Sequence, residues 1–161
     1  MKKVLALLVM MTAAHCVLAQ QLPVTDLVNA RTGKTVTLGK ACPAGKMTLV
    51  CFWGSWCAHG KHQLQTIAQA QPTWGKILNM AIVGIATDED RTEKLVLPYI
   101  QARGWTFANY IDRASALKHA LGASALPYIL IIDKQGKVAF THTGYMESGA
   151  LFGELEKVAG R

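Results

Sequence analysis

Clusters of charge and of aromatic residues are missing from this chain of 161 residues, of which 7% are aromatic. Lys and Arg outnumber Asp and Glu by 17 to 10, but they are scattered and form no basic stripe. Because nucleic-acid recognition needs such a stripe, the sequence predicts no nucleic-acid partner. A glycine-rich phosphate-binding loop, internal repeats and low-complexity segments are missing as well. The 51% hydrophobic residues exclude a disordered chain and suffice for an ordinary core.

A segment that could span a membrane is missing after the first twenty residues. Lys2 and Lys3 precede an apolar run over residues 4–11, and small or branched residues precede a predicted cleavage after Ala19. This arrangement is typical of a secretory signal peptide. The run is shorter than the roughly 20 residues that a spanning helix needs. A retained membrane anchor and lipidation at Cys16 are the weaker interpretations of the same segment.

The predicted organisation is a signal peptide over residues 1–19 and a single domain over residues 20–161. We expect a periplasmic or secreted protein that meets the membrane only during export. Loss of Lys2 and Lys3 lowers the formal net charge from +7 to +5, which fits an ordinary solvated surface.

Cysteine is scarce, with four in the whole chain. Cys16 lies in the predicted signal peptide, which leaves Cys42, Cys51 and Cys57 in the mature protein. In an exported protein an odd count means that at least one thiol is free, transiently used or intermolecular. The pattern around each thiol must therefore decide its role.

The surroundings of Cys57 differ from those of the other two. Residues 48–52 form an apolar run that predicts a buried strand, and Gly54 and Ser55 interrupt it. An amphipathic helix pattern follows at once, so Cys57 is expected where a buried strand passes into a helix. The unpaired N–H groups and positive dipole end of a helix favour an anion, and a thiolate is the anion that Cys57 can form.

The segment from Leu49 to Gln63 reads LVCFWGSWCAHGKHQ. It resembles the active-site segment of thioredoxin-fold thiol–disulfide oxidoreductases of the periplasmic TlpA/ResA type, whose pattern is roughly L-V-N-F-W-A-S-W-C-x-P-C-x-x-E. The agreement is close up to Cys57. Beyond it, His59 replaces the usual proline, Gly60 the second cysteine and Gln63 the frequent glutamate. The resemblance covers nearly all of the mature chain and implies an α/β thioredoxin fold, with a central mixed sheet flanked by helices and an N-terminal β-hairpin extension.

The patterns along the chain predict the elements of that fold. Strands are expected over residues 22–28, 35–38, 47–53, 77–86, 105–107, 128–132 and 137–143. Helices are expected over residues 57–70, 92–102, 114–121 and 148–158, the first ended by Pro72 and the second interrupted by Pro98. The expected buried faces are Leu64, Ile67 and Ala68 in the first helix, and Leu95, Val96, Tyr99 and Ile100 in the second.

The resemblance implies that Cys57 is the nucleophile of thiol–disulfide exchange on protein thiols and disulfides of the export compartment. It also implies that His59 tunes the thiolate through its charge or a hydrogen bond. Because Gly60 replaces the resolving thiol, the mixed disulfide formed by Cys57 waits for an outside thiol or redox partner, as in monothiol glutaredoxins. A degenerate binding module that captures substrate without turnover, and a scaffold without redox work, are the alternatives.

The resemblance also assigns the docking surface. Pro127 is the expected cis-proline that faces Cys57, and its carbonyl and the backbone of its neighbour Leu126 are expected to pair with an extended substrate. A trans proline at a strand start is the alternative. Trp53 and Trp56 complete the expected surface.

Cys51 and Cys42 are the other candidates for a resolving thiol. Cys51 stands where related thioredoxins carry a buried acid, and the missing side chain at Gly60 leaves room for it to approach Cys57. A small buried hydrophobe is the favoured interpretation of Cys51, and Cys42 is expected on a loop outside the core. With Gln63 also in place of an acid, the family's proton-transfer helpers are missing.

Two other chemical classes fit the sequence less well. Cys57, His59 and His62 offer ligands for copper or zinc, but their spacing does not place them on one helix face, and no cofactor is expected. A peroxiredoxin would need Pro and Thr or Ser at the positions of Val50 and Gly54.

Overall fold

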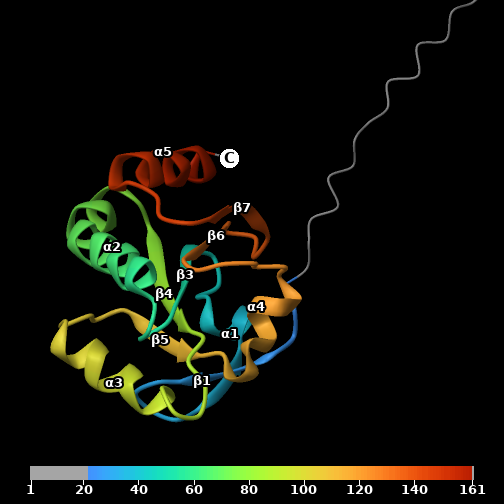
Figure 1. The fold of residues 1–161 in the computed structure, drawn as a ribbon. Coiled ribbons are helices and arrows are strands. Elements are labelled where there is room, and N and C mark those ends of the chain that lie inside the picture. The colour runs from blue at the N-terminus through green and yellow to red at the C-terminus, as the bar shows by residue number, and fades with distance from the viewer. Residues whose placement is uncertain (1–21, 161) are drawn as a thin grey trace, which may run out of the picture.

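A seven-stranded sheet forms the centre of the computed structural model, which describes residues 22–160 (Figure 1). The strands are β1 (Asp26–Asn29), β2 (Thr35–Thr37), β3 (Met47–Trp53), β4 (Met80–Ala86), β5 (Ala108–Ile111), β6 (Tyr128–Ile132) and β7 (Val138–Thr143). Their order in the sheet is β2-β1-β5-β4-β3-β6-β7. β4 is parallel to β3 and β5, and all other neighbours are antiparallel. This mixed sheet agrees with the fold that the resemblance implies.

β3 lies between β4 and β6 and is buried over its whole length. Successive side chains of a strand point to opposite faces, so Cys51 and Trp53 enter one core while Val50 and Phe52 enter the other. An apolar run without alternation is what a central strand covered on both faces requires. The C-terminal end of β3 thereby holds the start of the loop that leads to Cys57.

Helices cover both faces of the sheet (Figure 1). α2 (Ala58–Ile77), α3 (Glu93–Ala102) and α5 (Ser148–Ala159) pack on the face that contains Cys51 and Trp53. On the opposite face, α1 (Leu38–Ala41) and α4 (Ala116–Ala120) contribute Leu38 and Leu117 to the second core. The 3₁₀ turn η1 (Arg113–Ser115) leads into α4.

The N-terminal hairpin consists of β1 and β2, which pair antiparallel. β1 also pairs with β5, where Val28 lies opposite Ile111. The hairpin therefore extends the sheet at the edge far from β7. The predicted hairpin is confirmed, although its first strand begins at Asp26 rather than at Leu22.

The prediction that Pro72 ends the first helix is wrong. α2 continues through Pro72 to Ile77, which is 58% exposed and is not the start of a strand. Proline removes one helical hydrogen bond, and packing beyond it compensates. Trp74 is buried and stacks on Phe152 of α5, with ring centroids 5.9 Å apart. β4 accordingly begins at Met80.

The predicted strand over residues 105–107 is also wrong, because β5 begins at Ala108. Trp105 and Phe107 are buried and stack on each other with ring centroids 5.8 Å apart. Their aromatic character therefore serves core packing rather than strand pairing.

The buried face of α3 is narrower than predicted. Val96 and Ile100 are fully buried, and Tyr99 packs against the same core. Leu95 was expected on this face but is 49% exposed, because it lies on the solvent side of the helix.

The predicted signal peptide lies outside the described residues. Over residues 22–160, the helices are too short or too polar to cross a bilayer.

Candidate functional site

Cys57 is the N-cap residue of α2. The thiol Sγ accepts a hydrogen bond from the backbone N–H of Gly60 at 3.4 Å, and the backbone N–H of Cys57 donates to the carbonyl of Gly54 at 2.9 Å. The sulfur is therefore directed at one of the unpaired N–H groups that begin a helix. This is the position in which an anion gains most from the helix dipole, and it confirms the predicted placement of Cys57 between strand and helix.

Leu126 and Pro127 face Cys57 from the start of β6. The Leu126–Pro127 peptide bond is cis, as the resemblance implies, and the carbonyl oxygen of Leu126 lies 4.0 Å from Sγ of Cys57. The carbonyl of Pro127 already accepts a hydrogen bond from the backbone N–H of Gly144 at 2.8 Å. Leu126 therefore supplies the carbonyl that faces the thiol from β6, and the carbonyl of Pro127 is engaged within the fold.

Asp88 anchors the loop between β3 and α2, a role that the sequence alone does not reveal. Its buried carboxylate accepts hydrogen bonds from the backbone N–H of Ser55 at 2.9 Å and from the Ser55 hydroxyl. Next to it, the backbone N–H of Thr87 donates to the carbonyl of Trp53 at 2.9 Å. These bonds tie the loop before Cys57 to the end of β4.

Gly60, at the position to which the resemblance assigns a second cysteine, is buried. A Cβ atom added there would lie 3.5 Å from Sγ of Cys57. It would also lie 3.1 Å from Cα and 3.2 Å from Cβ of Trp53, which is a tight contact. The backbone thus places position 60 close enough to Cys57 for a second thiol, but Cys57 carries the one thiol of this pair of positions.

The two tryptophans of the expected docking surface have different environments. Trp53 is fully buried and packs against Tyr99 and Trp105, with ring centroids 5.6 Å and 5.3 Å apart. Its assignment to the docking surface is therefore wrong, because the alternation of β3 turns its side chain into the core. Trp56 is 62% exposed and packs its indole over Gly54, so it alone of the pair can meet a partner.

His59 and His62 lie on the exposed side of α2. Within the described residues His59 makes no hydrogen bond to Cys57, so any influence on the thiolate acts through its charge. His62 stacks on Tyr145 with ring centroids 4.7 Å apart. Over residues 22–160, no three His, Cys, Asp or Glu side chains are grouped so that they could hold a metal ion.

Gln63, at the position to which the resemblance assigns an acid, has a structural task. Its amide is buried, accepts a hydrogen bond from the backbone N–H of Met146 at 2.7 Å and donates to the Met146 carbonyl at 3.2 Å. A carboxylate could accept the first bond but could not donate the second. Gln63 therefore holds α2 to the segment before α5.

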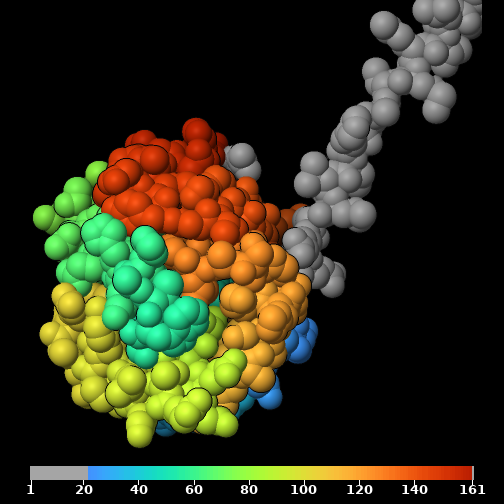
Figure 2. Space-filling view, viewed as in Figure 1, coloured from blue at the N-terminus to red at the C-terminus, as the bar shows by residue number. Residues whose placement is uncertain are grey.

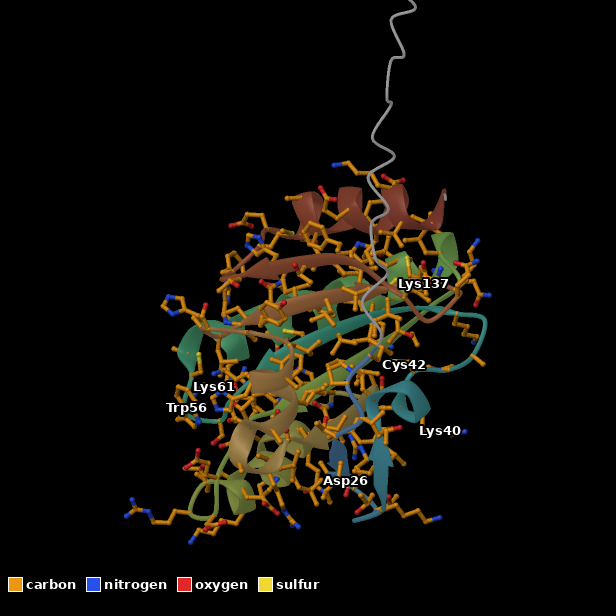
Figure 3. All side chains as sticks on the ribbon, turned by 90° about the vertical axis from the view of Figure 1, so that its right-hand side faces the viewer. Asp26, Lys40, Cys42, Trp56, Lys61 and Lys137 are labelled. Carbon is orange, nitrogen blue, oxygen red and sulfur yellow. The ribbon has the colours of Figure 1, made fainter. Side chains whose placement is uncertain are left out.

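Of the other two thiols in residues 22–160, Cys51 is buried and Cys42 is half-buried, and all three cysteines of this range are free. Cys51 is fully buried, and its burial, together with the nearby Cys57, raises its pKa well above the ordinary range. Burial also raises the pKa of Cys42 to about 11, although a hydrogen bond with Thr48 opposes the shift. Cys42 precedes β3 while Cys57 follows it, and Figure 3 shows Cys42 far from Trp56.

A pocket of about 670 Å³ opens beside Cys57. Its wall includes Trp56, the chain neighbour of Cys57, and Leu126, whose carbonyl contacts the thiol. In Figure 2 the start of α2 (teal) lies between the β4–α3 segment (yellow-green) and the α4–β6 segment (orange), which supply most of the pocket wall. A hollow of about 750 Å³ between α2 and the segment before β5 has no cysteine, histidine or carboxylate on its wall.

Comparisons with known proteins agree with this geometry. The model of the thioredoxin-like family matches residues 45–138. The thiol-disulfide oxidoreductase ResA of Bacillus thuringiensis is 29% identical over 114 residues, which are 71% of this chain and 64% of the relative. The chain thus spans less than two-thirds of that relative's length. ResA of Geobacillus kaustophilus is 27% identical over 94% of this chain and 95% of its own length.

A solved structure is similar over most of the chain. The thioredoxin-like protein of Porphyromonas gingivalis superposes with a TM-score of 0.77 and 27% identity, over 87% of this chain and 92% of its own. The family match covers both the segment around Cys57 and the cis-proline. The chain belongs to the thioredoxin-like family, as a thioredoxin-fold protein of the TlpA/ResA type.

Proposed function

We propose that this protein carries out thiol–disulfide exchange on protein thiols and disulfides, with Cys57 as its nucleophile. One observation carries the proposal. Sγ of Cys57 accepts the N–H of Gly60 at the start of α2 and lies 4.0 Å from the carbonyl of Leu126, beside the cis-proline. The ResA relatives are named thiol-disulfide oxidoreductases, which supports the same reaction class.

In the proposed reaction the Cys57 thiolate attacks one sulfur of a substrate disulfide. A bond forms between that sulfur and Sγ, the substrate S–S bond breaks, and the departing sulfur leaves with the electron pair and takes up a proton. The N–H of Gly60 stabilises the anion before attack. Trp56 and the backbone of Leu126 offer the surface on which the substrate chain lies.

A thiol from outside resolves the mixed disulfide in this proposal. Gly60 supplies no second thiol, and Cys51 is buried, with a pKa raised by that burial. Because the thiolate is the attacking species, Cys51 is a poor resolving group. Cys42 lies at the opposite end of β3. We also propose an exported protein, which the predicted signal peptide supports.

Capture of a mixed disulfide tests the proposal. The purified mature protein is mixed with a disulfide-bonded peptide, and the adduct is mapped by mass spectrometry. We expect one adduct, on Cys57, that dithiothreitol releases. Cys57→Ser should abolish the adduct and Cys42→Ser, the matched control, should leave it unchanged. An adduct on Cys42 or Cys51, or none at all, would contradict the assignment of Cys57.

A binding module without turnover is the second candidate, and the glycine at position 60 favours it. Such a module would hold its partner through Trp56 and the groove beside Leu126. Its affinity should survive Cys57→Ser and fall with Trp56→Ala. If the protein carries out exchange, Cys57→Ser should instead abolish the covalent adduct, and Trp56→Ala should reduce it less. The two variants therefore separate the two candidate functions.

A further inference from the structure

The pocket beside Cys57 has charges of both signs on its wall. Glu89, Asp90 and Arg91 come from the segment between β4 and α3, and Lys118 and His119 come from α4. The two ion pairs among the described residues join Arg113 to Glu93 and Lys157 to Glu154. The five charged or titratable groups on the pocket wall are therefore not paired with one another, and a ligand can pair with them.

The size of the pocket limits its occupant. About 670 Å³ lies within the range of roughly 300–1,000 Å³ that is usual for small-molecule sites. Cys57 itself is not on the pocket wall, but Trp56, its chain neighbour, and Leu126, whose carbonyl faces the thiol, are, so an occupant that reacts with Cys57 must extend past these two residues. A small molecule with carboxylate and ammonium groups and a sulfur of its own satisfies both conditions.

We propose that this pocket binds a low-molecular-weight thiol that carries both carboxylate and ammonium groups, and that Cys57 removes this thiol from its mixed disulfides with proteins. The inference rests on the proposed function of Cys57 and names its small-molecule substrate. Lys118 and His119 face the carboxylates, and Glu89 and Asp90 face the ammonium group. Cys57 then needs no second cysteine in the protein, because another molecule of the same small thiol releases it from the mixed disulfide.

The proposed sequence has two exchanges. The Cys57 thiolate attacks the small thiol's sulfur in the protein mixed disulfide, so a bond forms to Sγ and the protein sulfur leaves with the electron pair and gains a proton. A second small thiol, as its thiolate, attacks the same small-thiol sulfur, and the Cys57 thiolate leaves. In the net reaction the protein sulfur is reduced to a thiol, the second small thiol is oxidised, and the two small-thiol groups leave joined as their disulfide.

The experiment compares two peptides that differ only in the small thiol. One peptide cysteine carries glutathione in mixed disulfide linkage, and the other carries 2-mercaptoethanol, which has no charged group. The rate of adduct formation on Cys57 is measured for the mature protein. We expect the glutathione peptide to react about tenfold faster, because charge-assisted contacts act on it alone. Raising the salt concentration should narrow the difference, since exposed charges are screened.

Variants identify the pocket as the cause. The double change Lys118→Ala, His119→Ala should bring the glutathione peptide down to the rate of the mercaptoethanol peptide and leave the latter rate unchanged. Lys137→Ala removes an equal charge far from Trp56 (Figure 3) and should change neither rate. Should the double variant fold poorly, Lys118→Gln together with the salt series replaces it.

The outcomes separate this inference from the proposed function. Equal rates with both peptides, or a preference that the double variant retains, would overturn the inference and leave the exchange reaction of Cys57 intact. Failure of Cys57 to react with either peptide would overturn the proposed function itself.

Discussion

Ser55 donates two hydrogen bonds to the carboxylate of Asp88, one from its backbone N–H at 2.9 Å and one from its hydroxyl. Ser55 is in the loop before Cys57, and Asp88 follows the end of β4. The carboxylate is fully buried. The loop before the nucleophile is thus held by a group that follows a different strand.

Loss of this anchor should destabilise the fold. Asp88→Ala leaves the N–H of Ser55 without its buried acceptor, and we expect the free energy of unfolding to fall by about 2–3 kcal/mol. Asp88→Asn keeps one acceptor and should cost less. Urea unfolding measures both. Asp90→Ala, at an exposed neighbour, is the control and should stay within about 0.5 kcal/mol of the parent; equal losses at the two positions would refute the anchor.

Restoring the second thiol should rebuild an internal disulfide. In Gly60→Cys the new Cβ lies 3.5 Å from Sγ of Cys57, so we expect mild oxidation to remove two alkylatable thiols and two mass units. Because the same Cβ crowds Trp53 at 3.1 Å, the reduced variant should be slightly less stable than the parent. Gly60→Ser carries the same crowding without the sulfur and separates the two effects. A new thiol that stays open to alkylation after oxidation would contradict the geometry.

Gln63→Glu should reveal the donor role of the amide through pH. An ionised carboxylate cannot donate to the Met146 carbonyl, whereas a protonated one can. The folded state therefore raises the pKa of the introduced carboxyl above its unfolded value, and the variant loses stability as pH rises through that range. We expect a loss of about 1–3 kcal/mol at pH 7.5 and a smaller loss near pH 4.

Gln65→Glu is the matched control for this change. Gln65 accepts a hydrogen bond from the indole N–H of Trp105 at 3.3 Å, and a carboxylate can accept it equally well. Thermal or urea unfolding at the two pH values should show little change. The donor role of Gln63 is refuted if the two variants respond to pH alike.

Alkaline pH should weaken the fold through Cys42. Burial raises its pKa in the folded state from 9.0 to about 11. Between these values the unfolded chain loses the proton and the folded chain keeps it, so the stability present below pH 9 is lost as pH rises toward 11. Cys51 acts in the same direction because its pKa is also raised. Urea unfolding between pH 7.5 and 10 measures the decline, and Cys42→Ala should reduce its slope; parallel slopes would rule out a contribution of Cys42.

Much of this architecture can be predicted from local pattern. The apolar run that forms β3 and the thiol at the start of α2 each follow from a segment of a few residues, whereas the cis-proline before β6 follows from the resemblance to the TlpA/ResA type. The burial of Trp53 can also be predicted from the sequence, because the alternation of side chains along β3 places it on the same face as Cys51. Trp56 lies beyond the end of β3, so the alternation of the strand does not determine the direction of its side chain, which is exposed.

Features that depend on distant contacts could not be predicted in this way. The bond from Ser55 to Asp88 spans 33 residues, and nothing near either residue indicates the other. The continuation of α2 through Pro72 depends on Trp74 meeting Phe152 of α5. Local propensity ends a helix at proline, and tertiary packing overrides it here.

The contact between Cys57 and Leu126 joins residues that are 69 positions apart. A ribosome must therefore finish β6, and β6 must settle against β3, before the sulfur has its facing carbonyl. A nascent or unfolded chain carries the same thiols without this arrangement. The arrangement around the thiol therefore exists only in the folded protein. The alkylation rate of Cys57 can be followed over time to report when the chain has folded.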